Sequence, residues 1–249
     1  GVSLSGVDTL LLVSGMAAPE DRIDQHRNVI NAAKAAGVKK IVYTSVQGAE
    51  VGTAFSPIIQ SNRQTEADIR DSGLDWVIGR NGIYIEPDVE YIESYSKAGE
   101  IANCAGDGRC GYTTRPELAF AYACMLAGSE HNGYTTRPEL ADAYARMLTE
   151  PKHNGHTYNL HGALLTQTEL ATFLNQAFGT ELAYRHMSFE AFKADRIAEL
   201  GTFIGTVIAG IYQGIQNGAS DNPSDFAAAA GRPHQSWDDY FAALKSAQS

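Results

Sequence analysis

The chain has 249 residues, 44% of them hydrophobic and 19% charged, which suits one large globular domain or a domain with a small lobe. Its formal net charge of -10 argues against a general nucleic-acid surface, because such surfaces need clustered lysine and arginine. The three cysteines follow no metal-ligand spacing, no signal peptide opens the chain, and the apolar run Phe203–Tyr212 is too short to span a bilayer. We therefore expect a soluble, cytoplasmic protein with neither a metal site nor a membrane segment.

The first third of the chain alternates strands with helices. Apolar runs that stop at small polar residues predict the strands, and apolar residues at helical spacing, followed by Gly37 or Gly73, predict the helices. The run VDTLLLV is typical of a strand buried on both faces. Such an alternation indicates an α/β fold with a parallel sheet. In chain order the expected elements are strand Val7–Val13, helix Arg22–Ala36, strand Lys40–Val46, helix Pro57–Ser72 and strand Leu74–Ile78.

Helices predominate after about residue 85. We divide the chain into residues 1–85, which form sheet, and residues 86–249, which hold the remaining sheet elements and a small, mostly helical lobe, with a substrate cleft between the two parts. The expected elements here are helices Val89–Ala98, Gln167–Phe178, Ser188–Leu200 and Ser236–Ala247, and short strands Thr157–Leu160 and Glu181–His186.

A tandem duplication interrupts the second part. Residues 111–132 and 133–154 are identical at sixteen of twenty-two positions, and two units are too few for a repeat protein. Each copy carries Thr-Arg-Pro-Glu, a capping-box pattern with an early proline, so each copy is expected to start a helix.

Three of the expected strands end in the same kind of residue: Ser14-Gly15, Thr44-Ser45 and Arg80-Asn81-Gly82. In open α/β sheets, ligands bind at the carboxyl ends of the strands, where small polar groups let a ligand approach the backbone. These residues are therefore candidates for a cofactor site. The alternative is that serine, glycine and asparagine end strands because they form turns.

Other patterns are weaker. The G-x-G-x-x-G at Gly106, Gly108 and Gly111 does not follow the first strand, so a glycine turn is preferred to a phosphate-binding loop. His153, His156 and His161 lie close together in the sequence, but no cysteine or carboxylate completes a metal site with them. The helix after KIVYTSV contains neither tyrosine nor lysine, which excludes the Tyr-x-x-x-Lys pair of ordinary short-chain dehydrogenases.

Several motifs resemble the NmrA-like atypical short-chain dehydrogenases. They are GVDTLLLVSG, QHRNVINAAKAAGVKKIVYTS, the pair Thr65-Glu66, RNGIY at residues 80–84, the GDG turn, TRPELA, HNGHTYNL and SDFAAAAGRP. The similarity is strongest to the NADPH-dependent quinone oxidoreductases and triphenylmethane reductases, and it covers nearly the whole chain.

The resemblance implies a Rossmann-like sheet that binds NADP(H), with NAD(H) left open, and direct hydride transfer to a quinone or similar electron-poor small molecule. Asn81 and Tyr84 would be the catalytic residues near the nicotinamide. The duplication leaves open whether Arg115 or Arg137 matches the family's single arginine, and a homodimer is also left open. The predicted cofactor-binding residues, including the strand-end hydroxyls, are Ser14, Gly15, Thr44, Ser45, Arg80, Asn81, Gly82, Ile83, Arg115 and Arg137.

The sequence also departs from the family. A family histidine is replaced by Asn62, and about 60 residues with the glycine-rich phosphate loop and the first strands are expected to be missing before the VDTLLLV strand. Two alternatives to an active reductase follow: a non-catalytic dinucleotide sensor, as NmrA-like regulators are, or an inactive fragment that lacks this N-terminal segment.

Overall fold

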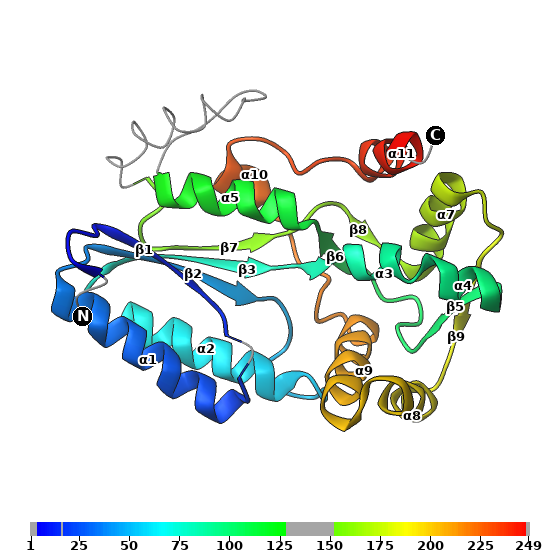
Figure 1. Cartoon of the computed structure of the whole chain (residues 1–249), viewed down its shortest axis with the longest axis horizontal. Coiled ribbons are helices and arrows are strands. Elements are labelled where there is room, and N and C mark those ends of the chain that lie inside the picture. The colour runs from blue at the N-terminus through cyan, green and yellow to red at the C-terminus, as the bar shows by residue number, and fades with distance from the viewer. Residues whose placement is uncertain (1–3, 16, 128–151, 248–249) are drawn as a thin grey trace.

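A four-stranded parallel sheet occupies one end of the molecule (Figure 1). The computed structural model describes residues 4–15, 17–127 and 152–247. The strand order is β1-β2-β3-β7, and the pairing sets Val13 beside Thr44 and Val46 beside Asn81. The strands are β1 (Thr9–Val13), β2 (Lys40–Val46), β3 (Asp75–Asn81) and β7 (His156–Leu160).

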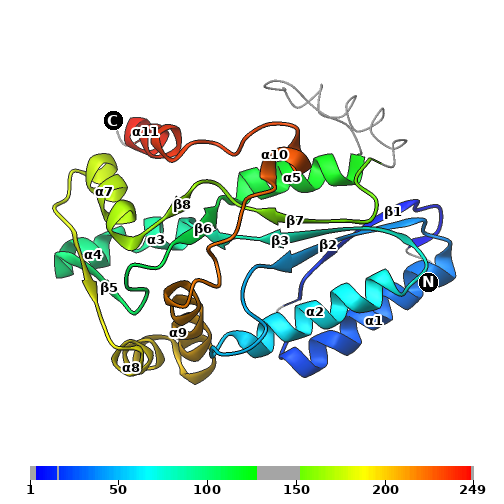
Figure 2. The ribbon, with the colours of Figure 1, turned by 180° about the vertical axis from the view of Figure 1, so that it is seen from behind.

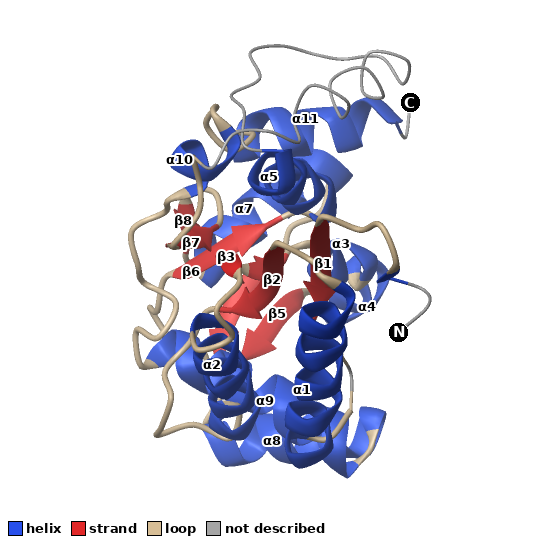
Figure 3. Cartoon of the chain, turned by 90° about the vertical axis from the view of Figure 1, so that its left-hand side faces the viewer, coloured by secondary structure: helices blue, strands red, loops and turns tan. Residues whose placement is uncertain are grey.

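Helices cover both faces of this sheet, so the chain forms three layers (Figure 3). Helices α1 (Pro19–Ala36) and α2 (Ser56–Arg70) lie on one face, and α5 (Arg115–Ala127) and α10 (Phe226–Ala230) lie on the other. Successive side chains of a strand point to opposite faces. Accordingly, Tyr43 packs with α1 and α2, whereas Val42 packs with α5. This alternation decides which strand-end residues can meet in one site.

The remaining elements extend beyond the carboxyl ends of β2 and β3 (Figure 2). They form a core of their own, which includes Tyr112, Leu174 and Trp237. Two small sheets lie here, β4-β6-β8 and β5-β9. The strands are β4 (Ile83–Tyr84), β5 (Glu100–Asn103), β6 (Cys110–Thr113), β8 (Leu164–Leu165) and β9 (Ala183–His186). The helices are α3 (Glu86–Glu90), α4 (Ile92–Ala98), α7 (Gln167–Phe178), α8 (Phe189–Leu200), α9 (Thr202–Gln216) and α11 (Trp237–Ala247).

The predicted α/β fold, with a parallel Rossmann-like sheet and a mostly helical C-terminal region, is confirmed. Both β2 and α7 have the predicted bounds, and α7 begins with a complete capping box between Thr166 and Glu169. One prediction about burial is wrong, because β1 is not buried on both faces. Its Val13 is 63% exposed, since β1 has β2 as its one strand neighbour among the described residues.

The first copy of the duplication supplies β6 and α5. The Thr114 side chain accepts a hydrogen bond from the Glu117 amide at 3.2 Å, as the capping pattern predicts. Glu117 forms an ion pair with Arg232 at 2.7 Å, and this contact holds the segment between α10 and α11 against α5. Most of the second copy, including Arg137, lies outside the described residues. No helix in the described part of the chain is long and apolar enough to cross a membrane.

Candidate functional site

A pocket of about 340 Å³ lies between α5 and the carboxyl ends of the strands. Thr44 and Asn81 reach it from β2 and β3, Tyr84 from β4, and Arg115 and Tyr122 from α5. Four of these five are residues that the sequence predicted for the cofactor or for catalysis. The structure therefore brings Thr44, Asn81, Tyr84 and Arg115 together at the edge where open α/β sheets bind ligands.

The Asn81 amide is held in one orientation. Only 8% of the residue is exposed; its Oδ1 accepts a hydrogen bond from the Tyr122 hydroxyl, and its Nδ2 lies 3.4 Å from the Tyr84 hydroxyl. The Tyr122 hydroxyl also lies 2.8 Å from the Gly79 carbonyl. Because the pocket offers an amide and a hydroxyl beside a guanidinium, its donors and acceptors fit the carboxamide of a nicotinamide ring.

Tyr84 and Arg115 form the outer wall of this pocket. The Arg115 guanidinium lies 5.4 Å from the centre of the Tyr84 ring, a cation–π geometry, and the Arg115 amide donates to Glu86 Oε1 at 2.7 Å. The Tyr84 side chain keeps much of its surface free, since the residue is 40% exposed. The Arg115 guanidinium also lies 3.8 Å from Glu90 and 4.0 Å from Glu86, so its charge is balanced and the wall is polar and partly exposed.

Ser14 and Gly15 follow β1 and lie at the same edge of the sheet as Thr44. The Ser14 amide donates to Thr44 Oγ1 at 2.9 Å, and the Gly15 amide donates to His26 Nε2 at 3.2 Å. His26 must therefore be unprotonated at Nε2. Burial, together with the nearby Arg22 charge, lowers the pKa of His26 and favours this neutral form. Asn62, the residue that replaces a family histidine, binds the Ser14 hydroxyl at 3.0 Å.

Ser45 follows Thr44 on β2, and Arg80 precedes Asn81 on β3. Because successive side chains of a strand alternate, Ser45 and Arg80 point to the opposite face of the sheet from the pocket. Both bind the fully buried Glu66 of α2: Ser45 Oγ at 2.7 Å and Arg80 Nη2 at 2.7 Å. Burial raises the pKa of Glu66, but the hydrogen bonds and charges of Arg80, Arg63 and Ser45 outweigh it and leave that pKa lowered. Ser45 and Arg80 thus do not join Asn81, and their role as cofactor contacts stays a prediction.

Gly82 and Ile83 connect the two parts of the molecule. A Cβ on Gly82 would lie 2.3 Å from the Gly111 carbonyl oxygen, so glycine is needed here for β3 to pass close to β6. Ile83 follows on β4, and its side chain lines a second, larger cavity. Neither residue is placed in the pocket beside Asn81.

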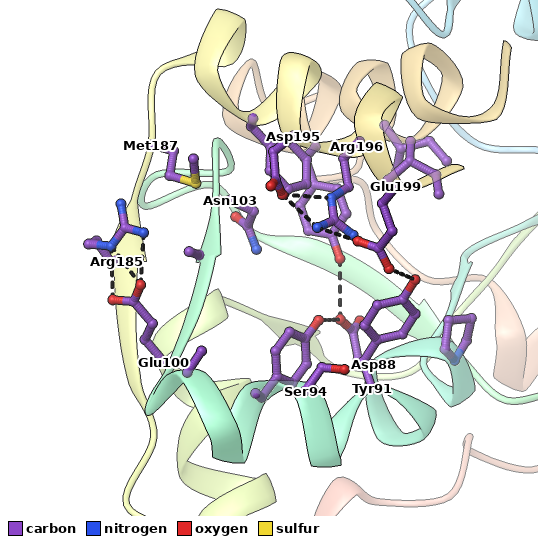
Figure 4. A pocket seen from close by; sticks show the side chains of 18 of the residues that line it. Asp88, Tyr91, Ser94, Glu100, Asn103, Arg185, Met187, Asp195, Arg196 and Glu199 are labelled. Atoms are coloured by element: carbon purple, nitrogen blue, oxygen red, sulfur yellow. Dashed lines mark hydrogen bonds and ion pairs between the residues drawn. The ribbon is translucent and has the colours of Figure 1, made fainter. Parts of the chain in front are cut away.

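The larger cavity has a volume of about 590 Å³ and lies among α3, α4, β5, β9, α8 and α9 (Figure 4). Tyr84 lines both this cavity and the pocket at the strand ends. Ion pairs occupy most of the charged groups of its wall: Arg196 binds Asp195 and Glu199, and Arg185 binds Glu100. The rest of the lining is rich in aromatic and aliphatic side chains, among them Tyr84, Tyr91, Tyr95, Phe192, Ile208, Ile211 and Tyr212.

The weaker sequence patterns have structural explanations. Gly106 and Gly108 lie in a turn packed on α9, where a Cβ on Gly108 would lie 2.2 Å from the Ile215 carbonyl oxygen, whereas Gly111 lies in β6. His153 binds the Tyr158 hydroxyl at 2.9 Å, while His161 Nδ1 lies 2.8 Å from the Gly162 carbonyl. Among the described residues, no three side chains of histidine, cysteine, aspartate or glutamate are grouped as a metal site.

Sequence reasoning missed two residues of this region, Tyr122 and Asp88. Tyr122 lies 41 positions from Asn81, and within the sequence it is one more hydrophobic residue of a mostly apolar helix. Asp88 follows the RNGIY motif closely, but nothing in the sequence shows that it is buried. Proximity to the motif was the available signal for Asp88, whereas Tyr122 had none.

Comparisons with known proteins agree with this geometry. Residues 3–102 match a family model described as NAD(P)H-binding. Quinone oxidoreductase 2 of Escherichia coli is 34% identical over 193 residues, which are 77% of this chain and 59% of that protein. An NmrA-like family domain-containing oxidoreductase of Aspergillus flavus is 31% identical over 128 residues, which are 50% of this chain and 41% of that protein. The chain thus spans less than two thirds of the length of either relative.

A solved structure extends the similarity to nearly the whole fold. The NADPH-dependent quinone oxidoreductase of E. coli, complexed with NADPH, superimposes with a TM-score of 0.80 at 29% identity, covering 98% of this chain and 78% of that one. The predicted resemblance is confirmed, and the chain belongs to the NAD(P)H-binding, NmrA-like family.

Proposed function

We propose that this protein is an NAD(P)H-dependent reductase that transfers a hydride to a quinone or a similar electron-poor small molecule. One observation carries the proposal: Tyr84 lines both the pocket at the strand ends and the aromatic cavity beside it. Hydride transfer needs the two rings in contact, so a nicotinamide ring in the first space and an acceptor in the second would meet beside the Tyr84 side chain.

The strand-end pocket is the proposed nicotinamide site. Asn81 and Thr44 would bind the carboxamide, and Tyr84 and Arg115 would cover the outer side of the ring. Ser14 and Gly15, which are bonded to Thr44 and His26, would lie along the same cofactor. NADPH is the first candidate because the E. coli relative was solved with it. When bound, the reduced nicotinamide supplies the hydride.

The larger cavity is the proposed acceptor site. Its mostly apolar and aromatic lining suits a flat, neutral ring system, and its ion pairs leave few free charges to bind a small anion. An electron-poor acceptor takes up a hydride without a dedicated tyrosine–lysine pair, so binding in the right orientation supplies most of the catalysis. The absence of that pair from α2 is consistent with such chemistry.

The test is NADPH binding and oxidation by the wild type and Asn81→Ala. The variant should lose about 1–3 kcal/mol in NADPH binding or in kcat/KM, because it removes the amide that would bind the carboxamide. Asn31→Ala is the matched control, since Asn31 is an exposed residue of α1. Binding without turnover of any quinone would favour the non-catalytic sensor, and Asn81→Ala indistinguishable from Asn31→Ala would refute the assigned site.

A further inference from the structure

A buried carboxyl group lines the large cavity at Asp88 of α3. Asp88 is labelled in Figure 4, and only 5% of the residue is exposed. Its Oδ1 accepts hydrogen bonds from Tyr95 of α4 at 2.9 Å and from Tyr212 of α9 at 3.2 Å. Both tyrosines line the same cavity. Two phenols from different helices therefore fix the position of one carboxyl group at the wall of the proposed acceptor site.

Asp88 differs from the other acids of this cavity. Glu100, Asp195 and Glu199 each pair with an arginine, whereas no ion pair joins Asp88 to a cation of the described residues. Burial raises the pKa of Asp88, and the phenol hydrogen bonds offset only part of that rise. The surroundings thus favour the protonated acid more than those of an ordinary aspartate do.

The groups that face Asp88 are themselves weak acids. Tyr95, Tyr212, Tyr112 and Cys110 interact with it, and burial raises the pKa of each. Arg196 acts electrostatically on Tyr95 and is itself paired with Asp195 and Glu199. Asp88 is therefore the strongest acid of the cluster.

Quinone reduction needs a proton as well as a hydride. The hydride adds with its electron pair to one carbonyl oxygen of the quinone, both carbonyl π bonds are lost as the ring becomes aromatic, and the other oxygen is left as an anion. That oxygen must gain a proton to give the neutral hydroquinone. In an aromatic cavity an unprotonated oxyanion is costly, so a positioned acid would accelerate the reaction.

We propose that Asp88, held by Tyr95 and Tyr212, donates this proton to the anionic oxygen of the acceptor; the assignment rests on the proposed reductase function. The O–H bond of the Asp88 carboxyl breaks as the O–H bond of the hydroquinone forms. The carboxylate that remains is stabilised by the two phenols, and a proton from water restores the acid. Asp88 would be a catalytic residue, and Tyr95 and Tyr212 would be positioning residues.

Two acceptors separate proton donation from hydride transfer. A cationic triarylmethane dye takes a hydride at its central carbon and becomes neutral without a proton, whereas a benzoquinone needs one. Asp88→Asn keeps an oxygen that accepts from both tyrosines but removes the acid. It should lower kcat for the quinone about a hundredfold. Its kcat for the dye should fall by a much smaller factor than its kcat for the quinone, because hydride transfer to the dye needs no proton donor.

Two further measurements do not depend on the Asp88→Asn activity. The infrared C=O band of a protonated carboxylic acid should be present in the wild type at neutral pH and lost in Asp88→Asn. In Tyr95→Phe, loss of a phenol that stabilises the carboxylate should move the high-pH decline of quinone turnover to higher pH. Loss of an equal factor for both acceptors, unchanged quinone turnover, or no such infrared band would overturn the assignment. If the wild type reduces neither acceptor, the reductase function fails, and the proton-donor role fails with it.

Discussion

The carboxylate of Glu66 should be a main source of stability for the sheet edge, and Glu66→Gln tests this directly. The side chain is fully buried and binds three arginines: Arg63 at 2.9 Å, Arg70 at 3.1 Å and Arg80 at 2.7 Å. Removing one member of a buried ion pair costs about 3–5 kcal/mol, because the remaining charges are left without compensation.

The magnitude follows from how much solvent reaches the arginines. Their side chains are 14%, 37% and 29% exposed, so water compensates part of the lost charge and the lower end of the range applies, about 3 kcal/mol. For a domain of this size, that corresponds to a fall in Tm of roughly 6–12 °C. Glu50→Gln is the matched control. It removes an exposed partner of Arg63 and should cost at most about 1 kcal/mol.

The assay is urea unfolding of the wild type and both variants, followed by tryptophan fluorescence, at several pH values. The pKa of Glu66 is lowered in the folded state, so its contribution is present above the ordinary glutamate pKa and is lost as the pH falls through the lowered value. The difference between the wild type and Glu66→Gln should therefore shrink in acid. A Glu66→Gln protein that is no less stable than Glu50→Gln would refute the reasoning.

Three further predictions concern the pocket and its supports. Tyr122→Phe should cost about 1–2 kcal/mol of stability and weaken NADPH binding severalfold, because the Asn81 amide loses a fixed partner; thermal unfolding and fluorescence titration check both. Gly82→Ala should destabilise the protein by at least about 1–3 kcal/mol, whereas Gly15→Ala meets only ordinary contacts at 3.7 and 3.8 Å; equal melting temperatures would contradict this. Ser45→Ala should cost about 1 kcal/mol by loss of its bond to Glu66 yet leave NADPH affinity unchanged, and a weaker affinity would instead support Ser45 as a cofactor contact.

Elements with a strong local pattern could be predicted from the sequence. Strand β2 is rich in β-branched and aromatic residues and lies between Gly37 and Gly48, and α7 has a capping box and a C-terminal glycine. Helix α9 was not predicted, because Gly205, Gly210 and Gly214 lower helix propensity along its apolar run. These glycines are explained by tertiary packing rather than by helix propensity. A Cβ on Gly210 would lie 2.3 Å from the Phe55 amide nitrogen, so glycine allows α9 to pack closely on the loop before α2.

The candidate site could be predicted only in part, for a related reason. Residues at strand ends can be found from local patterns, and this placed Thr44 and Asn81 correctly at one edge. Partners from distant elements cannot: Tyr122 reaches Asn81 only because α5 crosses that face, and Tyr212 reaches Asp88 across 124 positions. Burial of Asp88 likewise depends on helices far along the chain.

Strand alternation links the fold to the proposed chemistry. Thr44 and Asn81 face α5 and stay available to a ligand, while Ser45 and Arg80, one position away, face α2 and are bound by Glu66. The ionic side of the sheet thus stiffens the strand ends, and the neutral side presents an amide and hydroxyls. Tyr84 lines both the pocket on this neutral side and the aromatic cavity, so it links the two spaces. A hydride would pass from the strand-end pocket to the aromatic cavity, both of which carry little net charge. In the wall of that cavity, Asp88 is the one acid that no described cation neutralises, and we therefore expect the proton to come from Asp88.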